Sequence, residues 1–186
     1  MLFDYVNQSD DAVSTDQQLR QFFTENYIKV RYIRFSVLDE EGNMLESEAL
    51  DELKATADDV FMKVNGGELS FDDALAQYND DEAMAAAPEG FTFGSQDASM
   101  PEYAADAFAL SEGKVGGVYA YSDGYYILER QAPDISYFEA RREQVESAAK
   151  DWAFNSYIAA AEEGLEVSES SICKKINFEN LMDYVK

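Results

Sequence analysis

The stretch VYAYSDGYYILER, residues 118–130, decides the fold of this chain. Aromatic and β-branched residues flank a Ser-Asp-Gly triplet at 122–124, and this pattern predicts two strands joined by a tight bend. Within the surrounding block, residues 28–132, we expect a compact α+β unit built on a small antiparallel sheet.

A further strand is predicted for YIKVRYIRFSVL, residues 27–38, because polar and apolar residues alternate there and β-formers are frequent. The turn DEEGN, residues 39–43, ends it. Tyr32 and Arg34 fall on one side of this strand, whereas Ile33 and Phe35 fall on the other.

Apolar residues at helical spacing predict the helices of the chain. These are residues 14–27, 47–67, 70–78, 100–110 and 136–164. Capping residues are expected at the helix starts: Ser14 or Thr15, with Gln17 or Gln18 three residues later, then Ser47, Ser70, and Ser136 with Glu139. Pro101 suits a first helical turn.

The remaining segments carry weaker patterns. Residues 79–99 are expected to form a loop, with a short strand possible at 91–93, and residues 111–117 a turn. The C-terminal stretch is mixed, and a strand is possible at 171–178.

The composition predicts a packed globule with an acidic surface. The chain has 186 residues, of which 46% are hydrophobic and 13% aromatic, and its formal net charge is −24. Nucleic acid and bare anionic membranes are therefore unexpected partners, because both need clustered basic residues. Basic or mixed-charge proteins are compatible partners. No apolar run of membrane-spanning length and no signal peptide occurs, although a mature or trimmed chain would look the same.

Several classes of site are excluded by residue content. Cys173 is the single cysteine and histidine is absent, so an internal disulfide, a His/Cys metal site and a histidine-based triad are ruled out. The acidic run NDDE, residues 79–82, offers ligands for Ca²⁺ but lacks the spacing of a calcium-binding helix–loop–helix. A solvated acidic loop is the favoured interpretation, and no metal or cofactor is expected.

Four stretches together resemble the parvulin-type peptidyl-prolyl isomerase domain of bacterial foldases of the PrsA and SurA type. They are VRYIRFSVLDEEGN (30–43), ADDVFMKVNGGELSFDDALAQYNDD (57–81), PEGFTFGS (88–95) and SMPEYAADAFALSEGKVGGVYAYSDGYYILER (99–130). The resemblance implies a parvulin-like domain at 28–132. Helical segments at 1–27 and 133–186 would then flank it as a chaperone-like region.

The resemblance also implies a catalytic set. The family's two histidine positions match Tyr32 and Tyr126, and its acidic or cysteine position matches Asp81. Both histidines are thus tyrosines here. Their rings and hydroxyls suit a pocket wall, but they lack a group that titrates near neutral pH. The alternative is a cross-strand aromatic pair without a site role.

The proline-binding positions of the family match three further residues. Met100 and Tyr103 match the pocket methionine and phenylalanine, with one residue fewer between them, and Phe93 matches a pocket-wall position. Met84 is a further candidate. Such an apolar pocket favours the twisted amide of the transition state by desolvating it, and no bond need be made or broken. For Met100 the alternative role is core filling.

Two functions remain open on this basis. One is a prolyl isomerase that assists the folding of exported proteins and binds unfolded, proline-containing chains. The other is a catalytically inactive parvulin-like module that binds unfolded polypeptides. The resemblance implies a location outside the cytoplasm, with membrane attachment only through a lipid anchor outside this chain. Because residues 39–48 are acidic, no preference for a phosphorylated residue before proline is expected.

Overall fold

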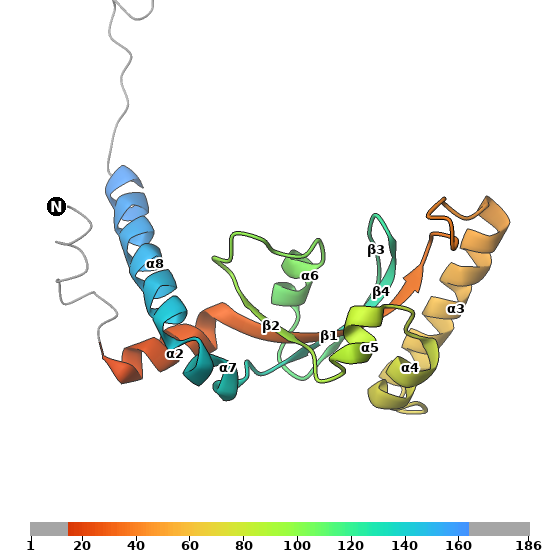
Figure 1. Ribbon diagram of the computed structural model, residues 1–186, viewed down its shortest axis with the longest axis horizontal. Coiled ribbons are helices and arrows are strands. Elements are labelled where there is room, and N and C mark those ends of the chain that lie inside the picture. Colours follow the sequence, from red (N-terminus) through yellow and green to blue (C-terminus); the bar gives the residue numbers. More distant parts are fainter. Residues whose placement is uncertain (1–14, 164–186) are drawn as a thin grey trace, which may run out of the picture. The chain divides into compact units, whose positions relative to one another are not determined.

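The computed structural model describes residues 15–163, and a four-stranded antiparallel sheet organises them (Figure 1). The strand order is β2-β1-β4-β3. The strands are β1 (Tyr27–Ser36), β2 (Phe91–Gly94), β3 (Val115–Ala120) and β4 (Gly124–Gln131). The helices are α2 (Asp16–Asn26), α3 (Ser47–Asn65), α4 (Phe71–Tyr78), α5 (Glu82–Ala86), α6 (Ala104–Ala109), α7 (Ile135–Ala140) and α8 (Arg142–Glu163). The predicted α+β class with a small antiparallel sheet and surrounding helices is confirmed.

The pairing of β1 with β4 fixes the two faces of the sheet. Tyr32 lies opposite Leu128, and Arg34 lies opposite Tyr126. Since opposed residues share a face and neighbours along a strand alternate, these four side chains project to the same side. The hairpin predicted from residues 118–130 is confirmed, although β3 already begins at Val115, across an irregularity in its register with β4.

Helices α3 and α4 cover the opposite face of the sheet, α4 against β1 and α3 against β3 and β4. Phe35 on β1 packs against Tyr78 of α4, with 6.3 Å between ring centroids. The Arg31 guanidinium lies 4.9 Å from the centroid of the Phe71 ring. The capping predicted for this helix is confirmed, because the Ser70 hydroxyl accepts a hydrogen bond from the Asp73 amide. This face therefore carries much of the core, and the Tyr32 face is left for the site.

One predicted cap and one predicted helix start are wrong. Ser47 is the first helical residue of α3 and not its cap; Glu46 holds the cap position in extended conformation and makes no side-chain cap bond. Helix α6 begins at Ala104, not at residue 100, because the Pro101 carbonyl accepts from the Ala104 amide in a separate turn. Met100 therefore precedes the helix.

The loop expected at residues 79–99 contains an additional helix, α5. Asp81 caps it, since its carboxylate accepts a 2.7 Å hydrogen bond from the Met84 amide. The possible strand at 91–93 is confirmed as β2, which pairs with the first half of β1. The loop prediction was wrong at α5 because five residues are too few to show a helical period.

The single long helix predicted for residues 136–164 is two helices. The chain leaves helical geometry at Arg141, where φ is −124° and ψ is 26°. Asp134 caps α7 in place of Ser136, because its carboxylate accepts from the Ser136 amide at 2.8 Å. Glu139, expected in a capping box, instead binds Arg20.

A second hydrophobic core joins α2 to α7 and the first turns of α8. Its buried members are Leu19, Phe22, Phe23, Tyr27, Phe138, Val145 and Ala149. The capping box predicted at the start of α2 is confirmed for Thr15 and Gln18. Residues 15–150 belong to one compact unit, and α8 continues from Asp151 into a second. The division of the chain at residues 27 and 132 stays a prediction.

Two predictions lie outside the described residues. These are the strand at 171–178 and any role of Ser14 as a cap. Among residues 15–163, no helix has the length and apolar character that crossing a membrane requires.

Candidate functional site

Three tyrosine rings meet on the sheet face that α4 leaves free, and we call them the tyrosine cluster. Ring centroids are 5.1 Å apart for Tyr32 and Tyr103, 5.2 Å for Tyr32 and Tyr126, and 5.8 Å for Tyr103 and Tyr126. Each residue is at most 9% exposed. Rings at these distances stabilise one another beyond their burial, so the cluster is a fixed aromatic surface.

The strand register accounts for two members of the tyrosine cluster. Tyr32 and Tyr126 stand diagonally across β1 and β4, because Tyr32 is opposite Leu128 while Tyr126 is opposite Arg34. The predicted cross-strand contact is therefore confirmed, as a diagonal pair.

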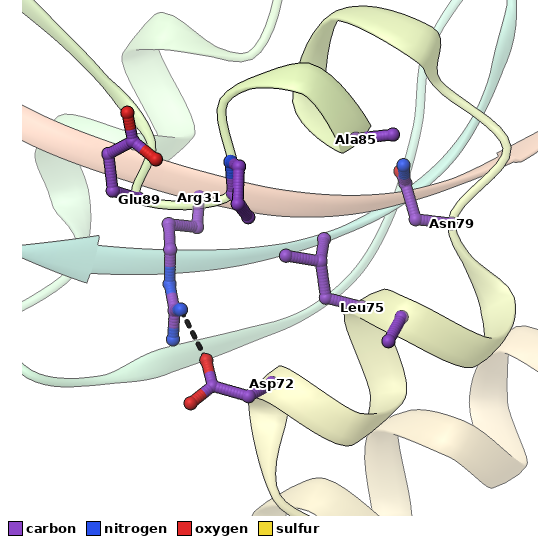
Figure 2. A pocket seen from close by; sticks show the side chains of 8 residues that line it. Arg31, Asp72, Leu75, Asn79, Ala85 and Glu89 are labelled. Carbon is purple, nitrogen blue, oxygen red and sulfur yellow. Dashed lines mark hydrogen bonds and ion pairs between the residues drawn. The ribbon is translucent and has the colours of Figure 1, made fainter.

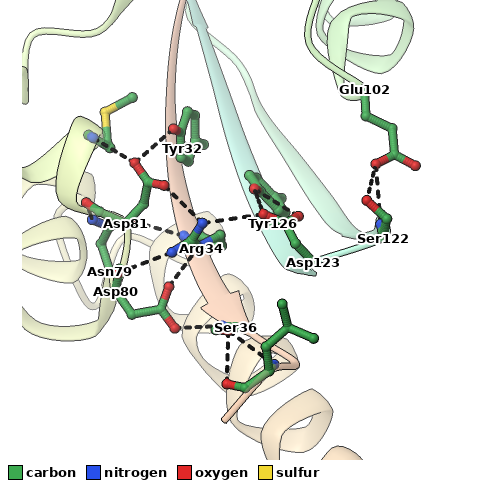
Figure 3. A network of polar contacts seen from close by, with 12 residues as sticks. Tyr32, Arg34, Ser36, Asn79, Asp80, Asp81, Glu102, Ser122, Asp123 and Tyr126 are labelled. Carbon is green, nitrogen blue, oxygen red and sulfur yellow. Dashed lines mark hydrogen bonds and ion pairs between the residues drawn. The ribbon is translucent and has the colours of Figure 1, made fainter. Parts of the chain in front are cut away.

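The third ring, that of Tyr103, comes from the segment before α6. Ser122 in the hairpin bend donates to the Glu102 carboxylate from its hydroxyl at 2.8 Å, which holds this segment over β4 (Figure 3). Ala104 and Ala107 are buried, and their small side chains let α6 approach the sheet. Phe93 on β2 then packs edge-on against Tyr103, with 6.2 Å between centroids.

Asp81 joins the tyrosine cluster to α5. One carboxylate oxygen accepts the Tyr32 hydroxyl at 3.0 Å and the Met84 amide at 2.7 Å, and the other pairs with Arg34 at 3.0 Å (Figure 3). Its side chain is only 14% exposed. Charge-assisted hydrogen bonds of this kind are the stronger ones, so Asp81 ties a strand, a helix start and a phenol together.

Arg34 is shared among three carboxylates. Besides Asp81, it pairs with Asp80 at 2.9 Å and with Asp123 at 3.2 Å. Asp123 also accepts the Tyr126 hydroxyl at 3.1 Å. The solvated acidic loop expected at 79–82 is thus wrong for Asp81, whereas Asp80 pairs with Arg34 and remains 42% exposed. Among residues 15–163, no group of three or more acids or cysteines is arranged to hold a metal ion.

The phenols of the cluster stay protonated well beyond neutral pH. Burial is the main cause that raises the pKa of Tyr32, Tyr103 and Tyr126 far above the usual value for tyrosine. The neighbouring carboxylates Asp81 and Asp123 raise these pKa values further. The cluster therefore offers a ligand neutral ring surface and hydroxyl dipoles held in place by acids.

The structure brings together five of the six site residues that the resemblance implied. Tyr32, Asp81, Tyr126, Phe93 and Tyr103 are in contact directly or through one another. Met100, which precedes α6, differs from these five in being 46% exposed, and its role in binding proline stays a prediction. Its alternative role as core filler is therefore wrong. Met84, the further pocket candidate, is completely buried in the core.

Sequence reasoning missed two residues of the site. Arg34 stands two residues after Tyr32 on the same strand face, so the alternation of β1 was an available signal. Tyr121 packs edge-on against Tyr126 at 5.3 Å and donates its hydroxyl to Asp106 at 2.6 Å. Tyr121 directly follows the last residue of β3, so the alternation of side chains along a strand does not predict to which face it points.

Solved structures similar to this chain are of the kind that the sequence resemblance named. A peptidylprolyl isomerase (PrsA) from Bacillus anthracis is 17% identical over 90% of this chain and 71% of its own, with a TM-score of 0.44. PrsA from Bacillus subtilis is 16% identical, covers 92% of this chain and 63% of its own, and has a TM-score of 0.44.

A single-domain structure is similar as well. A PpiC-type peptidyl-prolyl cis-trans isomerase domain is 19% identical over 60% of this chain and 97% of its own, with a TM-score of 0.44. No protein-family model and no curated protein sequence matches the chain. The chain spans about two thirds of the length of the PrsA structures, 71% and 63%.

Replacing Asp81 tests its bridging role. Asp81→Ala removes the cap of α5 and leaves the Tyr32 hydroxyl without its acceptor, so the free energy of unfolding should fall by about 1–3 kcal/mol. Asp81→Asn keeps an acceptor for both groups and should cost less. Urea unfolding measures both. Equal losses for the two variants would show that the charge, and not the hydrogen bonds, is what matters.

The buried phenols predict a loss of stability at alkaline pH. Their pKa values in the folded protein lie above the unfolded value of about 10. The stabilisation is therefore complete below pH of about 10 and is lost as the pH rises beyond it. Ultraviolet titration of tyrosinate should show a group of phenols that ionise only on unfolding. Titration of every tyrosine near pH 10 in the folded protein would contradict the packed cluster.

Proposed function

We propose that this chain is the parvulin-type peptidyl-prolyl isomerase part of a foldase that assists exported proteins and binds X–Pro segments of unfolded chains at the tyrosine cluster. The observation that carries the proposal is the meeting of Tyr32, Tyr103 and Tyr126 around the Asp81 hydrogen bond. By the resemblance, we place the protein outside the cytoplasm.

Prolyl isomerisation needs no proton transfer, and this suits a site whose phenols stay protonated. The barrier to rotation about a peptide bond is about 18–20 kcal/mol, much of it from amide resonance. A surface that packs on the proline ring and excludes water favours the twisted amide, which has lost that resonance. The Tyr103 ring, with Phe93 beside it, would receive the proline. The Tyr32 hydroxyl, held by Asp81, keeps the surface in shape.

A catalytically inactive binding module is the second candidate. It is favoured by the close packing of the three rings, which are between 6% and 9% exposed. A proline ring must displace or overlie them to be gripped. In this case the domain contributes only affinity for unfolded chains. The protein would then assist folding by preventing aggregation, without catalysing isomerisation.

An isomerisation assay on an X–Pro peptide separates the two candidates. The isomerase predicts a rate above that of buffer, a loss of at least tenfold in Tyr103→Ala, and a smaller loss in Tyr32→Phe, which keeps the ring. Tyr125→Ala serves as control, because Tyr125 pairs with Phe35 on the α4 side of the sheet. A wild-type rate equal to buffer, together with suppressed aggregation of an unfolded protein, would establish the binding module instead.

Phosphorylation before proline should not improve binding. Residues 39–48, which follow β1, contain Asp39, Glu40, Glu41, Glu46 and Glu48 and no basic residue. Arg34, the cation beside the cluster, already pairs with three carboxylates. A phospho-Ser-Pro peptide should therefore bind no more tightly than its unmodified form in a fluorescence anisotropy titration. Tighter binding of the phosphopeptide would refute this specificity.

A further inference from the structure

A second candidate site lies on the other side of β1. A cavity of about 520 Å³ opens between α4, α5 and the loop that leads into β2, and we call it the α4–α5 groove (Figure 2). Its size falls within the range of ligand-binding cavities in proteins. Because β1 alternates, Arg31 lines this groove while Tyr32 projects to the tyrosine cluster on the opposite face. The two sites are therefore separate.

The floor of the α4–α5 groove is apolar. It is formed by Leu75 and Ala76 from α4, Ala85 from α5, and Pro88 from the following loop. Leu75 is buried, whereas Ala76, Ala85 and Pro88 are exposed. Exposed apolar walls of this kind make a surface groove that a polypeptide can cross, in contrast to an enclosed chamber.

The one cation that lines the groove is already neutralised. Arg31 donates to the Asp72 carboxylate and, at 2.7 Å, to the Glu129 carboxylate, and its side chain is 13% exposed. Phe71 covers the guanidinium at 4.9 Å. An anionic ligand such as a phosphate would have to displace two carboxylates from Arg31. Anions are therefore poor ligands for this groove.

Glu89 makes the charge balance of the groove negative. It is exposed, and among residues 15–163 it has no ion pair. Figure 2 shows the carboxyl groups of Glu89 and Asp72 on either side of Arg31. Among the residues that line the groove, Arg31 carries one positive charge, and Asp72 and Glu89 carry two negative charges. The uncompensated negative charge favours a cationic ligand.

We propose that the α4–α5 groove binds a lysine or arginine side chain of an extended polypeptide. The aliphatic stem would lie on Leu75, Ala76 and Ala85, as long basic side chains do on apolar surfaces. The cationic group would then lie beside Glu89, the carboxylate of the groove that has no ion pair among the described residues. Basic segments are common in unfolded proteins. The groove would therefore give an unfolded client a second contact with this protein, in addition to the contact proposed at the tyrosine cluster. The proposal does not depend on isomerase activity.

Binding of labelled peptides tests the groove directly. The probe is an unstructured, proline-free peptide of alanine and serine with one central lysine, compared with the same peptide carrying glutamine or glutamate. Fluorescence anisotropy should show lysine bound more tightly than glutamine, and glutamine more tightly than glutamate. The preference should weaken as salt is added. Equal affinities for the lysine and glutamine peptides would overturn the proposal.

Removing one negative charge at a time tests whether the lysine peptide binds at the groove. Glu89→Gln should weaken binding of the lysine peptide roughly two- to fivefold, the range expected for an exposed ion pair. Glu112→Gln makes the same charge change outside the groove and should leave the affinity unchanged. An equal loss in both variants would mean that the peptide responds to the overall charge of −24 and not to the groove.

Filling the groove provides a test that does not alter charge. Ala85→Trp should abolish the preference for lysine, whereas Ala86→Trp, an exposed neighbour on α5 that does not line the groove, should keep it. Circular dichroism checks that both variants fold. Ala85→Trp should also retain any isomerase rate on a substrate without basic residues, so failure of this proposal and failure of the isomerase are distinguishable. Competition by free lysine as strong as by the peptide would indicate an amine site, against the proposal.

Discussion

The register between β1 and β4 is the constraint on which both candidate sites depend. It sets Tyr32 opposite Leu128 and Arg34 opposite Tyr126, and so places two phenols and a guanidinium on one face. A slip of one residue would exchange the faces of β1. Arg31 and Phe35 would then meet the tyrosine face, and Tyr32 would be driven into α4. The buried residues on both faces, among them Ile33 and Leu128, make such a slip costly.

Much of the fold followed from local patterns, and the failures have a common cause. The alternation of β1, the hairpin and the cap of α2 are properties of consecutive residues, so the sequence was sufficient for them. The start of α7 was decided instead by competition between two nearby caps, of which Asp134 prevailed over Ser136. Helix α5 depends on Asp81, whose carboxylate is held in place by Tyr32 and Arg34 from a distant strand. The helix propensity of five consecutive residues does not reflect contacts with a strand that is distant in the sequence.

The candidate site likewise contains residues that the sequence predicted and residues that it did not. Tyr32, Tyr126 and Asp81 were found through a family resemblance and not through any property of their own. In the structure the Tyr32 hydroxyl donates to Asp81, and the Tyr126 ring joins them by packing against Tyr32 at 5.2 Å. Met100 was placed with them by its position in the chain, but the turn at Pro101 leaves it exposed. Arg34 was overlooked because a lone arginine on a strand is ordinary until its carboxylate partners are known.

On both faces of β1, an arginine is neutralised by carboxylates of the same chain. Arg31 and Arg34 are three residues apart and project to opposite sides, and each is bound by at least two carboxylates from other elements. The chain has 14 basic residues against 38 acidic ones, and these two arginines are both taken up in intramolecular ion pairs. Beside each arginine, carboxylates border apolar side chains, those of the tyrosine cluster on one face and Leu75 and Ala76 on the other. Electrostatic complementarity governs encounter rate and partner choice more than affinity. Under the two proposals, the basic residues of an unfolded client would speed its encounter with the protein, and its apolar or proline residues would add to the affinity.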